Sequence, residues 1–202
     1  VSGYYKTSND VGVFGRISFL IFIVVLGIES ARQTVARLKK GRRVEELEQF
    51  ALNDSMTGMY NRNAYDYFVK NEKDFEGYVI VTFDLNNLKQ CNDQYGHRAG
   101  DEYIINAAHI IEDNFERYGK CYRIGGDEFC CIIPKGRYFK IERVMHKIDQ
   151  DVEILNHKNI IPVPVGIAYG YAVFTADDTD PEKVRERADE DMYRNKKAMK
   201  QS

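Results

Sequence analysis

Hydrophobic positions along the chain recur in two ways, and each predicts a different kind of element. Short apolar runs and period-two alternation predict strands, whereas apolar residues three and four positions apart predict helices. From residue 53 onward the pattern predicts, in chain order, helix 62–73, strand 78–83, helix 100–117, strands 120–124 and 128–133, helix 139–155, strand 163–174 and helix 181–199.

The connection between two of these strands indicates the type of sheet. Strands 120–124 and 128–133 are separated only by Gly125-Gly126-Asp127, a sequence that predicts a hairpin. Because the two strands of a hairpin are antiparallel, the sheet cannot be wholly parallel. The pattern therefore predicts an α+β fold, a ferredoxin-like sandwich with a central, mainly antiparallel sheet.

The N-terminal part differs, because residues 11–28 are apolar with only one charge, Arg16. A helix that spans a bilayer needs roughly 20 apolar residues, and this stretch comes near that length. The charges that follow, with no acid between Ser30 and Val44, are Arg32, Arg37, Lys39, Lys40, Arg42 and Arg43. This positive-inside pattern predicts a transmembrane helix followed by a cytoplasmic chain. A soluble helix and a signal peptide are the alternatives.

Residues 29–52 are mostly good helix formers, and their apolar positions repeat like a coiled-coil seam that slips near Gly41. A paired signalling helix and a solvated linker helix both fit this pattern. The sequence therefore predicts three parts: the end of a membrane region over 1–28, a helical linker over 29–52 and a folded domain over 53–202. Since the first residue is valine rather than methionine, we expect the chain to be a fragment.

Composition narrows the possible function classes. Hydrophobic residues make up 44% and charged residues 30% of the 202 residues, which is enough apolar material for a core. There are 29 basic and 31 acidic residues, a net charge of −2, so no basic field indicates a nucleic-acid partner. The four cysteines have neither zinc-site spacing nor the density of a disulfide scaffold. We interpret them as small core residues.

Three acidic residues are the first candidates for chemistry. Asp84 follows the predicted strand 78–83, and Asp127 and Glu128 lie at the predicted hairpin. If the hairpin lies beside that strand, the three carboxylates converge. Hard oxygen ligands without clustered histidine or cysteine favour Mg²⁺ or Mn²⁺, completed by phosphate oxygens of a nucleotide. The alternative is that these acids are ordinary solvated turn residues.

The residues Gly125-Gly126-Asp127-Glu128-Phe129 resemble the signature of the GGDEF family of diguanylate cyclases. Other segments agree with this resemblance in the same order: Asp54 to Arg62, Asp84 to Asp93 with Gly96-His97 and Gly100-Asp101, and Asp189, Tyr193 and Lys196. Together they cover about Leu52 to Lys200. The resemblance implies a palm-like sandwich of the nucleotide-cyclase type. It also implies that two GTP condense into cyclic di-GMP with release of two pyrophosphates.

The resemblance also implies the cofactor and its ligands. Two Mg²⁺ or Mn²⁺ ions per active site would be held by Asp84, Asp127, Glu128 and the carbonyl of Leu85. Glu128 would assist at the metal or help to activate the ribose 3′-hydroxyl. With Lys89, the residues Asp127 and Glu128 form the implied catalytic set.

The same resemblance implies residues that bind the substrate. Asn92 and Asp101 would read guanine, because a carboxylate accepts hydrogen bonds from guanine N1 and N2 and an amide complements N2 and N3. Triphosphate contacts would come from backbone amides near Asn87 and Leu88. The positive charges facing the triphosphate would come from Lys89, Lys196 and Lys200.

Partners follow from the implied reaction. Each domain would hold one GTP, so a homodimer is implied, anchored to the bacterial inner membrane as the output of a sensor. Glu116 and Gly119 stand where an inhibitory cyclic di-GMP site would need arginine and aspartate, so that site is not expected. Two alternatives remain: a degenerate GTP-binding or protein-interaction module, and a cyclase or polymerase palm with another product.

Overall fold

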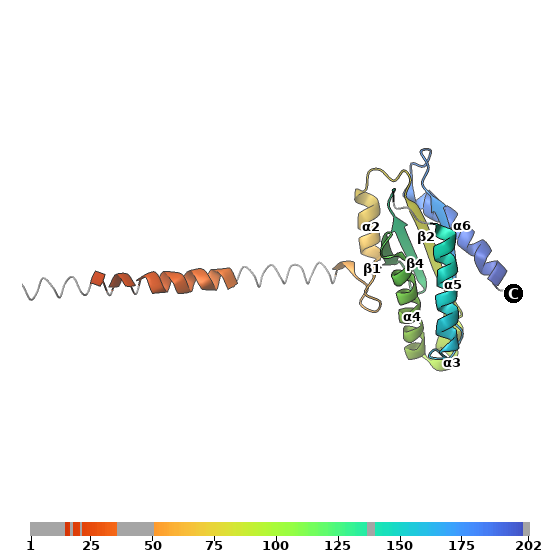
Figure 1. Ribbon diagram of the computed structural model, residues 1–202, viewed down its shortest axis with the longest axis horizontal. Helices are drawn as coiled ribbons and strands as arrows, with labels where there is room; N and C mark the ends of the chain where they lie inside the picture. The colour runs from red at the N-terminus through yellow and green to blue at the C-terminus, as the bar shows by residue number, and fades with distance from the viewer. Residues whose placement is uncertain (1–14, 17, 21, 36–50, 137–139, 200–202) are drawn as a thin grey trace, which may run out of the picture. The chain divides into compact units, whose positions relative to one another are not determined.

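The computed structural model describes residues 15–16, 18–20, 22–35, 51–136 and 140–199. Contacts divide the chain into two compact units, Val1–Gln49 and Phe50–Ser202, and each is described by itself. Figure 1 shows the second unit as a sheet with helices on both of its faces. The predicted chemistry lies in this second unit.

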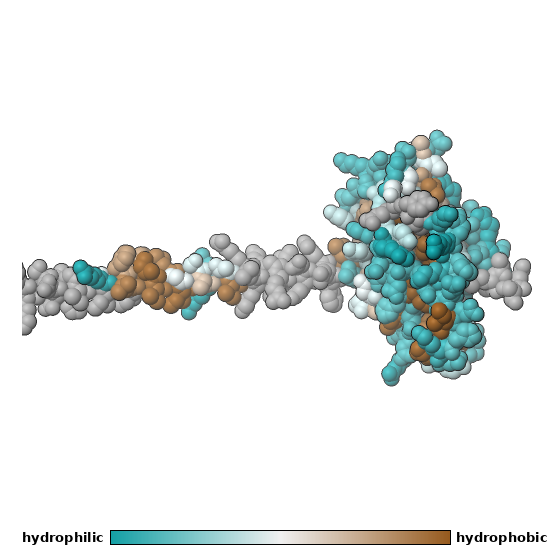
Figure 2. Space-filling model, in the orientation of Figure 1, coloured by the Kyte–Doolittle hydropathy of each residue, from teal (hydrophilic) through white to brown (hydrophobic). Residues whose placement is uncertain are grey.

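In the first unit the described residues are helical and exposed. The stretch Ser18–Val35 has a mean hydropathy of 1.5 over 18 residues, none of them buried, and Figure 2 shows its apolar side chains in brown. By length and composition it is the one helix among the described residues that could cross a membrane, but a signal sequence has the same features. Membrane anchoring therefore stays a prediction. Most of the predicted linker, residues 36–50, lies outside the described residues.

The second unit is built on a five-stranded sheet in the order β1-β3-β4-β2-β5. Its strands are β1 Tyr60–Asn61, β2 Val79–Asn86, β3 Lys120–Arg123, β4 Glu128–Ile133 and β5 Gly166–Val173. All neighbouring strands are antiparallel except β1 and β3. The structure thus confirms the predicted α+β fold, its mainly antiparallel sheet and the hairpin of β3 and β4.

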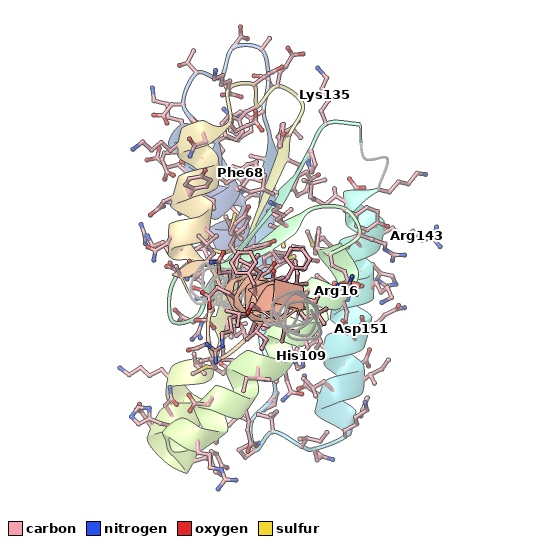
Figure 3. The ribbon with its side chains drawn as sticks, turned by 90° about the vertical axis from the view of Figure 1, so that its left-hand side faces the viewer. Arg16, Phe68, His109, Lys135, Arg143 and Asp151 are labelled. Carbon is pink, nitrogen blue, oxygen red and sulfur yellow. The ribbon has the colours of Figure 1, made fainter. Side chains whose placement is uncertain are left out.

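Five helices of the second unit's described residues pack on the sheet, and Figure 1 shows their arrangement. They are α2 Arg62–Asn71, α3 Leu88–Tyr95, α4 His97–Phe115, α5 Ile141–His157 and α6 Pro181–Met199. Apolar side chains of α3, α4 and α5 form the larger core on one face, and those of α2 and α6 form a smaller core on the other. Figure 3 shows α2, with Phe68, and α5, with Arg143 and Asp151, on opposite sides of the sheet.

The structure corrects the predicted helix over 100–117. The helix in this region, α4, begins earlier, at His97, and ends at Phe115, and a separate helix that was not predicted, α3, precedes it. Gly96 separates them with a φ of 83°, a value that favours glycine. Periodicity missed α3 because only two of its eight residues, Leu88 and Cys91, are buried, too few to show a repeat.

Two strand predictions also change. The predicted strand 78–83 is too short, because β2 continues to Asn86 and Asp84 lies inside it. The last strand is shorter than the predicted 163–174, since β5 runs only from Gly166 to Val173. The two-residue strand β1 has too few residues to show a pattern. The extension of β2 places Asp84 within the hydrogen-bonded sheet.

The cysteines are confirmed as core residues. All four are free and buried. Cys121 and Cys131 face each other across β3 and β4, with 3.0 Å between their sulfur atoms. Burial raises the pKa of the Cys131 thiol, which keeps it protonated.

Candidate active site

The register of the sheet brings the predicted acidic segments side by side. Asp84 of β2 lies directly opposite Glu128 of β4. The amide of Leu85 donates to the carbonyl of Asp127 over 3.1 Å, so the hairpin turn also lies against β2. The neighbouring even-numbered residues of β2 and β4, Ile80 and Cys130, belong to the smaller core. Asp84 and Glu128 therefore lie on the face of α2 and α6.

The side chain of Lys196 reaches this place from α6. Its Nζ bonds to Oδ1 of Asp84, and both side chains are largely enclosed, at 27% and 17% exposure. In the described part of the chain, no three His, Cys, Asp or Glu side chains gather closely enough to hold a metal ion. The structure thus brings together the backbone around Asp84, Asp127 and Glu128, while their convergence as carboxylates stays a prediction.

A single arginine organises the hairpin turn. Nε of Arg123 donates to the carbonyl of Gly125 over 3.2 Å, and Nη2 donates to the carbonyl of Gly126 over 2.9 Å. Its Nη1 donates to Oδ1 of Asp54 over 3.0 Å. The side chain of Arg123 is only 10% exposed, and its bonds to Gly125 and Asp54 are partly buried, whereas its bond to Gly126 is exposed. Arg123 therefore fastens the turn to the start of the domain.

The other partner of this bond, Asp54, is itself held in place. It accepts hydrogen bonds from the amide and hydroxyl of Thr57 over 2.9 and 2.8 Å. Burial raises the pKa of Asp54, but the bonds from Thr57 and Arg123 outweigh burial and hold the pKa below its usual value. The sequence does not reveal the hydrogen bond between Arg123 and Asp54, because the two residues are far apart along the chain.

The amides predicted to meet the triphosphate lie at the start of α3. Asn87 caps this helix with a φ of 63° and makes no side-chain capping bond. The first amide bonded to its carbonyl is that of Cys91, over 2.9 Å, as expected for a helix that begins at Leu88. The first amides of a helix have no partner within it and carry partial positive charge. This helix start follows directly after β2.

The predicted guanine readers lie where α3 meets α4. A Cβ on Gly100 would be 2.0 Å from Oδ1 of Asn92, so the side chain of Asn92 lies against Gly100. Asp101 is the next residue of α4 and is exposed. Only a glycine at position 100 permits the side chain of Asn92 to lie this close to the backbone of α4. The structure thus places Asn92 and Asp101 at the same corner, on two different helices.

Tyr103 is a further residue of this region that sequence reasoning missed. Its hydroxyl donates to the carbonyl of Asn86 over 2.5 Å and accepts from the amide of Gly166 over 2.7 Å. The side chain is fully buried, and burial raises its pKa to about 12. Tyr103 ties α4 to the ends of β2 and β5. In the sequence it is one more apolar position of a helix.

Gly126 lies in the turn without a structural need for glycine. Its φ is not in the left-handed region, and an added Cβ would meet nothing within 4 Å. At Gly125, by contrast, a Cβ would lie 3.0 Å from Oε2 of Glu128. The space beside the turn is therefore open at Gly126, next to Asp127.

A cavity of about 280 Å³ lies at the two positions where an inhibitory cyclic di-GMP site would need arginine and aspartate. Glu116 and Gly119 line it together with Lys120 and the rings of Phe68, Tyr78, Tyr118 and Tyr122.

The two remaining predicted lysines lie elsewhere in the chain. Lys89 is exposed at the start of α3. Lys200 lies outside the described residues, so its predicted role is untested.

Comparison with protein-family models assigns this arrangement to a family. The model described as "Diguanylate cyclase, GGDEF domain" matches residues 51–202. The chain belongs to the GGDEF family of diguanylate cyclases. The match confirms the predicted resemblance, and the description "diguanylate cyclase" refers to cyclic di-GMP synthesis by the family in general.

Curated relatives of this GGDEF chain include three bacterial proteins. The bifunctional diguanylate cyclase and cyclic di-GMP phosphodiesterase MucR of Pseudomonas aeruginosa is 31% identical over 68% of the chain and 22% of its own length. Diguanylate cyclase DgcS of Shewanella oneidensis is 28% identical, with 75% and 52% covered. The probable diguanylate cyclase DgcC of Escherichia coli is 26% identical, with 82% and 46% covered. The chain spans about half the length of DgcS and DgcC and less of MucR.

Solved GGDEF structures share the fold. The coiled coil and GGDEF domain of DgcB from Caulobacter crescentus, in complex with c-di-GMP, matches with a TM-score of 0.71 at 23% identity and covers 86% of this chain and 95% of that one. Diguanylate cyclase SiaD from Pseudomonas aeruginosa, in complex with its activator SiaC, has a TM-score of 0.64 at 21% identity, with 98% and 78% covered. These likenesses confirm the fold class.

Proposed function

We propose that this GGDEF protein is an active diguanylate cyclase that condenses two GTP into cyclic di-GMP and releases two pyrophosphates. The observation that carries the proposal is the register of the sheet. It sets Asp84 opposite Glu128, holds the turn with Asp127 against Leu85, and leads from β2 directly into the start of α3. The segments that carry the predicted carboxylates, the Leu85 carbonyl and the first amides of α3 thus lie near one end of β2, which supports the proposal.

The donor set fits Mg²⁺ or Mn²⁺, two ions per site, because it consists of hard oxygens. Asp84, Asp127, Glu128 and the carbonyl of Leu85 would hold the ions. When bound, such ions neutralise phosphate charge and lower the pKa of the attacking hydroxyl. Lys196 now neutralises Asp84 and would transfer its hydrogen bonds to the triphosphate. Asp127 and Glu128 would orient the 3′-hydroxyl.

The remaining residues would bind and orient GTP. The amides around Asn87 and Leu88 at the start of α3 suit a polyanion, because helix starts carry unpaired amides and positive dipole charge. Lys89, Lys196 and Lys200 would add positive charge. The open space at Gly126 leaves room beside the turn. The carboxylate of Asp101 would accept hydrogen bonds from N1 and N2 of guanine, and the amide of Asn92 would complement N2 and N3.

The reaction requires two domains. The 3′-oxygen of one GTP attacks the α-phosphorus of the other, pyrophosphate leaves, and the second half-reaction repeats this in the opposite direction. Since each domain would hold one GTP, the working unit would be a homodimer, as the predicted linker 29–52 suggests. Helix 18–35 would anchor it in the bacterial inner membrane as a sensor output, with domain 53–202 in the cytoplasm. An inhibitory cyclic di-GMP site is not proposed.

The descriptions of the similar proteins support this proposal. DgcS and DgcC are described as a diguanylate cyclase and a probable one, DgcB is seen with c-di-GMP, and SiaD with an activator. One observation favours a second candidate, a GTP-binding module without turnover: Asp84 is paired with Lys196 rather than grouped with two further acids. The experiment must therefore separate binding from turnover.

The test uses the full 202-residue chain in lipid nanodiscs, fused at its N-terminus to a dimeric coiled coil. It is incubated with GTP and Mg²⁺, and cyclic di-GMP and pyrophosphate are measured by chromatography and mass spectrometry. We expect product from the wild type and a loss of about 100-fold or more in Asp127→Ala, because a group that stabilises charge in the transition state is removed.

The matched control is Glu190→Ala, an exposed acid of α6 that has no role in the proposed site, which should retain wild-type activity. GTP binding is measured in parallel by calorimetry. Binding without product in the forced dimer would overturn the cyclase proposal and establish the binding module. Absence of binding would overturn both.

A further inference from the structure

Strand β5 is an edge of the sheet, yet three of its outer backbone groups are paired with side chains of α6. Edge strands expose unpaired amides and carbonyls that attract strands of other chains. In β5 the alternate residues Tyr169, Tyr171 and Val173 point these groups away from β2. Side chains of α6 bond to all three of these residues.

The three bonds form a regular series. Oδ1 of Asn195 accepts from the amide of Tyr169 over 3.3 Å, and Oδ2 of Asp191 accepts from the amide of Tyr171 over 3.2 Å. Nη2 of Arg187 donates to the carbonyl of Val173 over 3.0 Å. The helix residues are spaced four apart and the strand residues two apart, so each lies on one side of its element. We call Arg187, Asp191 and Asn195 the edge clamp.

The helix lies directly on the strand beneath this clamp. A Cβ on Gly170 would be 2.0 Å from the amide nitrogen of Met192 and 2.4 Å from the carbonyl oxygen of Ala188. No side chain separates the two backbones there, and Ala188 is fully buried. This contact requires a residue without a side chain at position 170, so it limits where α6 can lie along β5. The hydrogen bonds of the clamp fix the same register, because a shift of α6 breaks them together.

The register of α6 matters because Lys196 follows Asn195. Asp84, to which Lys196 is bonded, lies opposite Ala168 of β5, the residue before Tyr169. The bond that holds Asn195 at Tyr169 therefore lies next to the place where Lys196 must reach across to β2. A turn or slide of α6 by one residue would move the root of the lysine by about 1.5 Å along the helix axis and about 100° around it.

We propose that Asp191 and Asn195 are positioning residues that fix the register of α6 on β5 and so hold Lys196 at the active site, ready for the phosphates of GTP. This rests on the proposed function, in which Lys196 binds the triphosphate. A lysine side chain is flexible and recovers part of a displacement. The effect on GTP recognition is therefore smaller than that of removing Lys196 itself.

The main test compares Asp191→Ala/Asn195→Ala with Glu190→Ala in the dimerised full chain. We expect the double variant to raise the KM for GTP by about 10-fold with a smaller change in kcat, because a binding group is displaced. Asp191→Asn, which keeps an oxygen acceptor, should retain the KM of the wild type where Asp191→Ala does not. A lower kcat at unchanged KM would mean only fewer folded molecules and would overturn the proposal.

A cycle with Lys196→Ala tests whether the clamp acts through this lysine. If it does, adding Asp191→Ala/Asn195→Ala to Lys196→Ala changes the KM little further. If the two effects multiply, the clamp does not act through Lys196. Should the double variant fail to fold, as judged by its thermal transition, Asn195→Ala alone replaces it in the same cycle.

A third measurement needs no GTP and separates failure of this proposal from failure of the proposed function. The rate at which an acylating reagent labels Lys196 is read from peptide masses, beside hydrogen exchange of the Tyr169 and Tyr171 amides. Loss of the clamp should accelerate both severalfold, and Glu190→Ala should change neither. Faster amide exchange with unchanged Lys196 labelling would overturn the positioning role, even in a protein that makes no cyclic di-GMP.

Discussion

The two faces of the sheet differ in what they bury. The face under α4 and α5 is apolar along the whole of β2, where Val81, Phe83 and Leu85 all join the larger core. The face under α2 and α6 is apolar at Ile80 but carries Asp84 further along β2, opposite Glu128. One face thus anchors the fold, and the other carries the polar chemistry at its end.

This division follows from the two-residue period of a strand. Because neighbouring side chains point to opposite faces, Asp84 can be polar while Phe83 and Leu85 are 1% and 3% exposed. The site therefore rests on a strand that is held from behind by the larger core. Residues that stabilise the fold and residues available for chemistry are therefore neighbours on one strand and differ only in the face to which they point.

The largest expected effect tests the anchoring face. Phe115 of α4 is fully buried and packs edge-to-face on Phe83, with ring centroids 5.6 Å apart. Phe115→Ala should lower the free energy of unfolding by about 3–5 kcal/mol, because it removes a large side chain and leaves a cavity. Val184→Ala, in the smaller core, should cost about 2 kcal/mol. Urea unfolding measures both, and equal costs would contradict the division into anchor and site.

A smaller effect on stability is expected when the hydroxyl of one buried tyrosine is removed on each side of the sheet. Tyr103, on the anchoring side, has a hydroxyl bonded to Asn86 and Gly166, and Tyr103→Phe should cost about 1–3 kcal/mol of stability. The hydroxyl of Tyr65, on the side of α2, has no partner among the described residues. Tyr65→Phe should therefore leave the free energy of unfolding unchanged or raise it. Thermal and urea unfolding of the two variants measure these changes. An equal loss of stability in Tyr65→Phe and Tyr103→Phe would contradict the prediction.

The smallest effect concerns high pH. Burial raises the pKa of Tyr103 from 10.0 to about 12, and it raises the pKa of Tyr65 and Tyr122 further. The folded state therefore keeps protons that the unfolded state loses. The contribution of each protonated phenol to the free energy of unfolding is fully present below about pH 10 and is lost as the pH rises through the pKa of the folded state. By about pH 11 the loss is about 1 kcal/mol for each phenol.

The measurement is urea unfolding at about pH 8 and about pH 11. The smaller core holds two of these phenols, Tyr65 and Tyr122, and the larger core holds Tyr103. Tyr65→Phe should therefore reduce the high-pH loss by about 1 kcal/mol. A variant as sensitive to pH as the wild type would show that Tyr65 ionises alike in both states.

Much of the fold was readable from local pattern. The hairpin around Gly125 and Gly126 was predicted because glycine and aspartate between two apolar runs is a local feature. Helix α6 was predicted with the bounds that it has. Helix α3 was not, since its helical state depends on burying Leu88 and Cys91 under the rest of the domain rather than on its own periodicity.

The candidate site divides in the same way. The acids Asp84, Asp127 and Glu128 were identifiable, because charged residues next to apolar strands stand out in a sequence. The bond from Arg123 to Asp54 was not, since it joins residues 69 positions apart. Nor was the reach of Lys196 to Asp84, which joins residues 112 positions apart.

By itself, then, the amino-acid sequence determined the α+β class, the hairpin and the residue types available for chemistry, because propensity, alternation and turn chemistry act over a few neighbouring residues. Only the tertiary structure decided that Asp84 lies opposite Glu128, that Arg123 fastens the turn, and that α6 lies in register on β5. These depend on which strands become neighbours, and strand order results from burying all apolar faces at once.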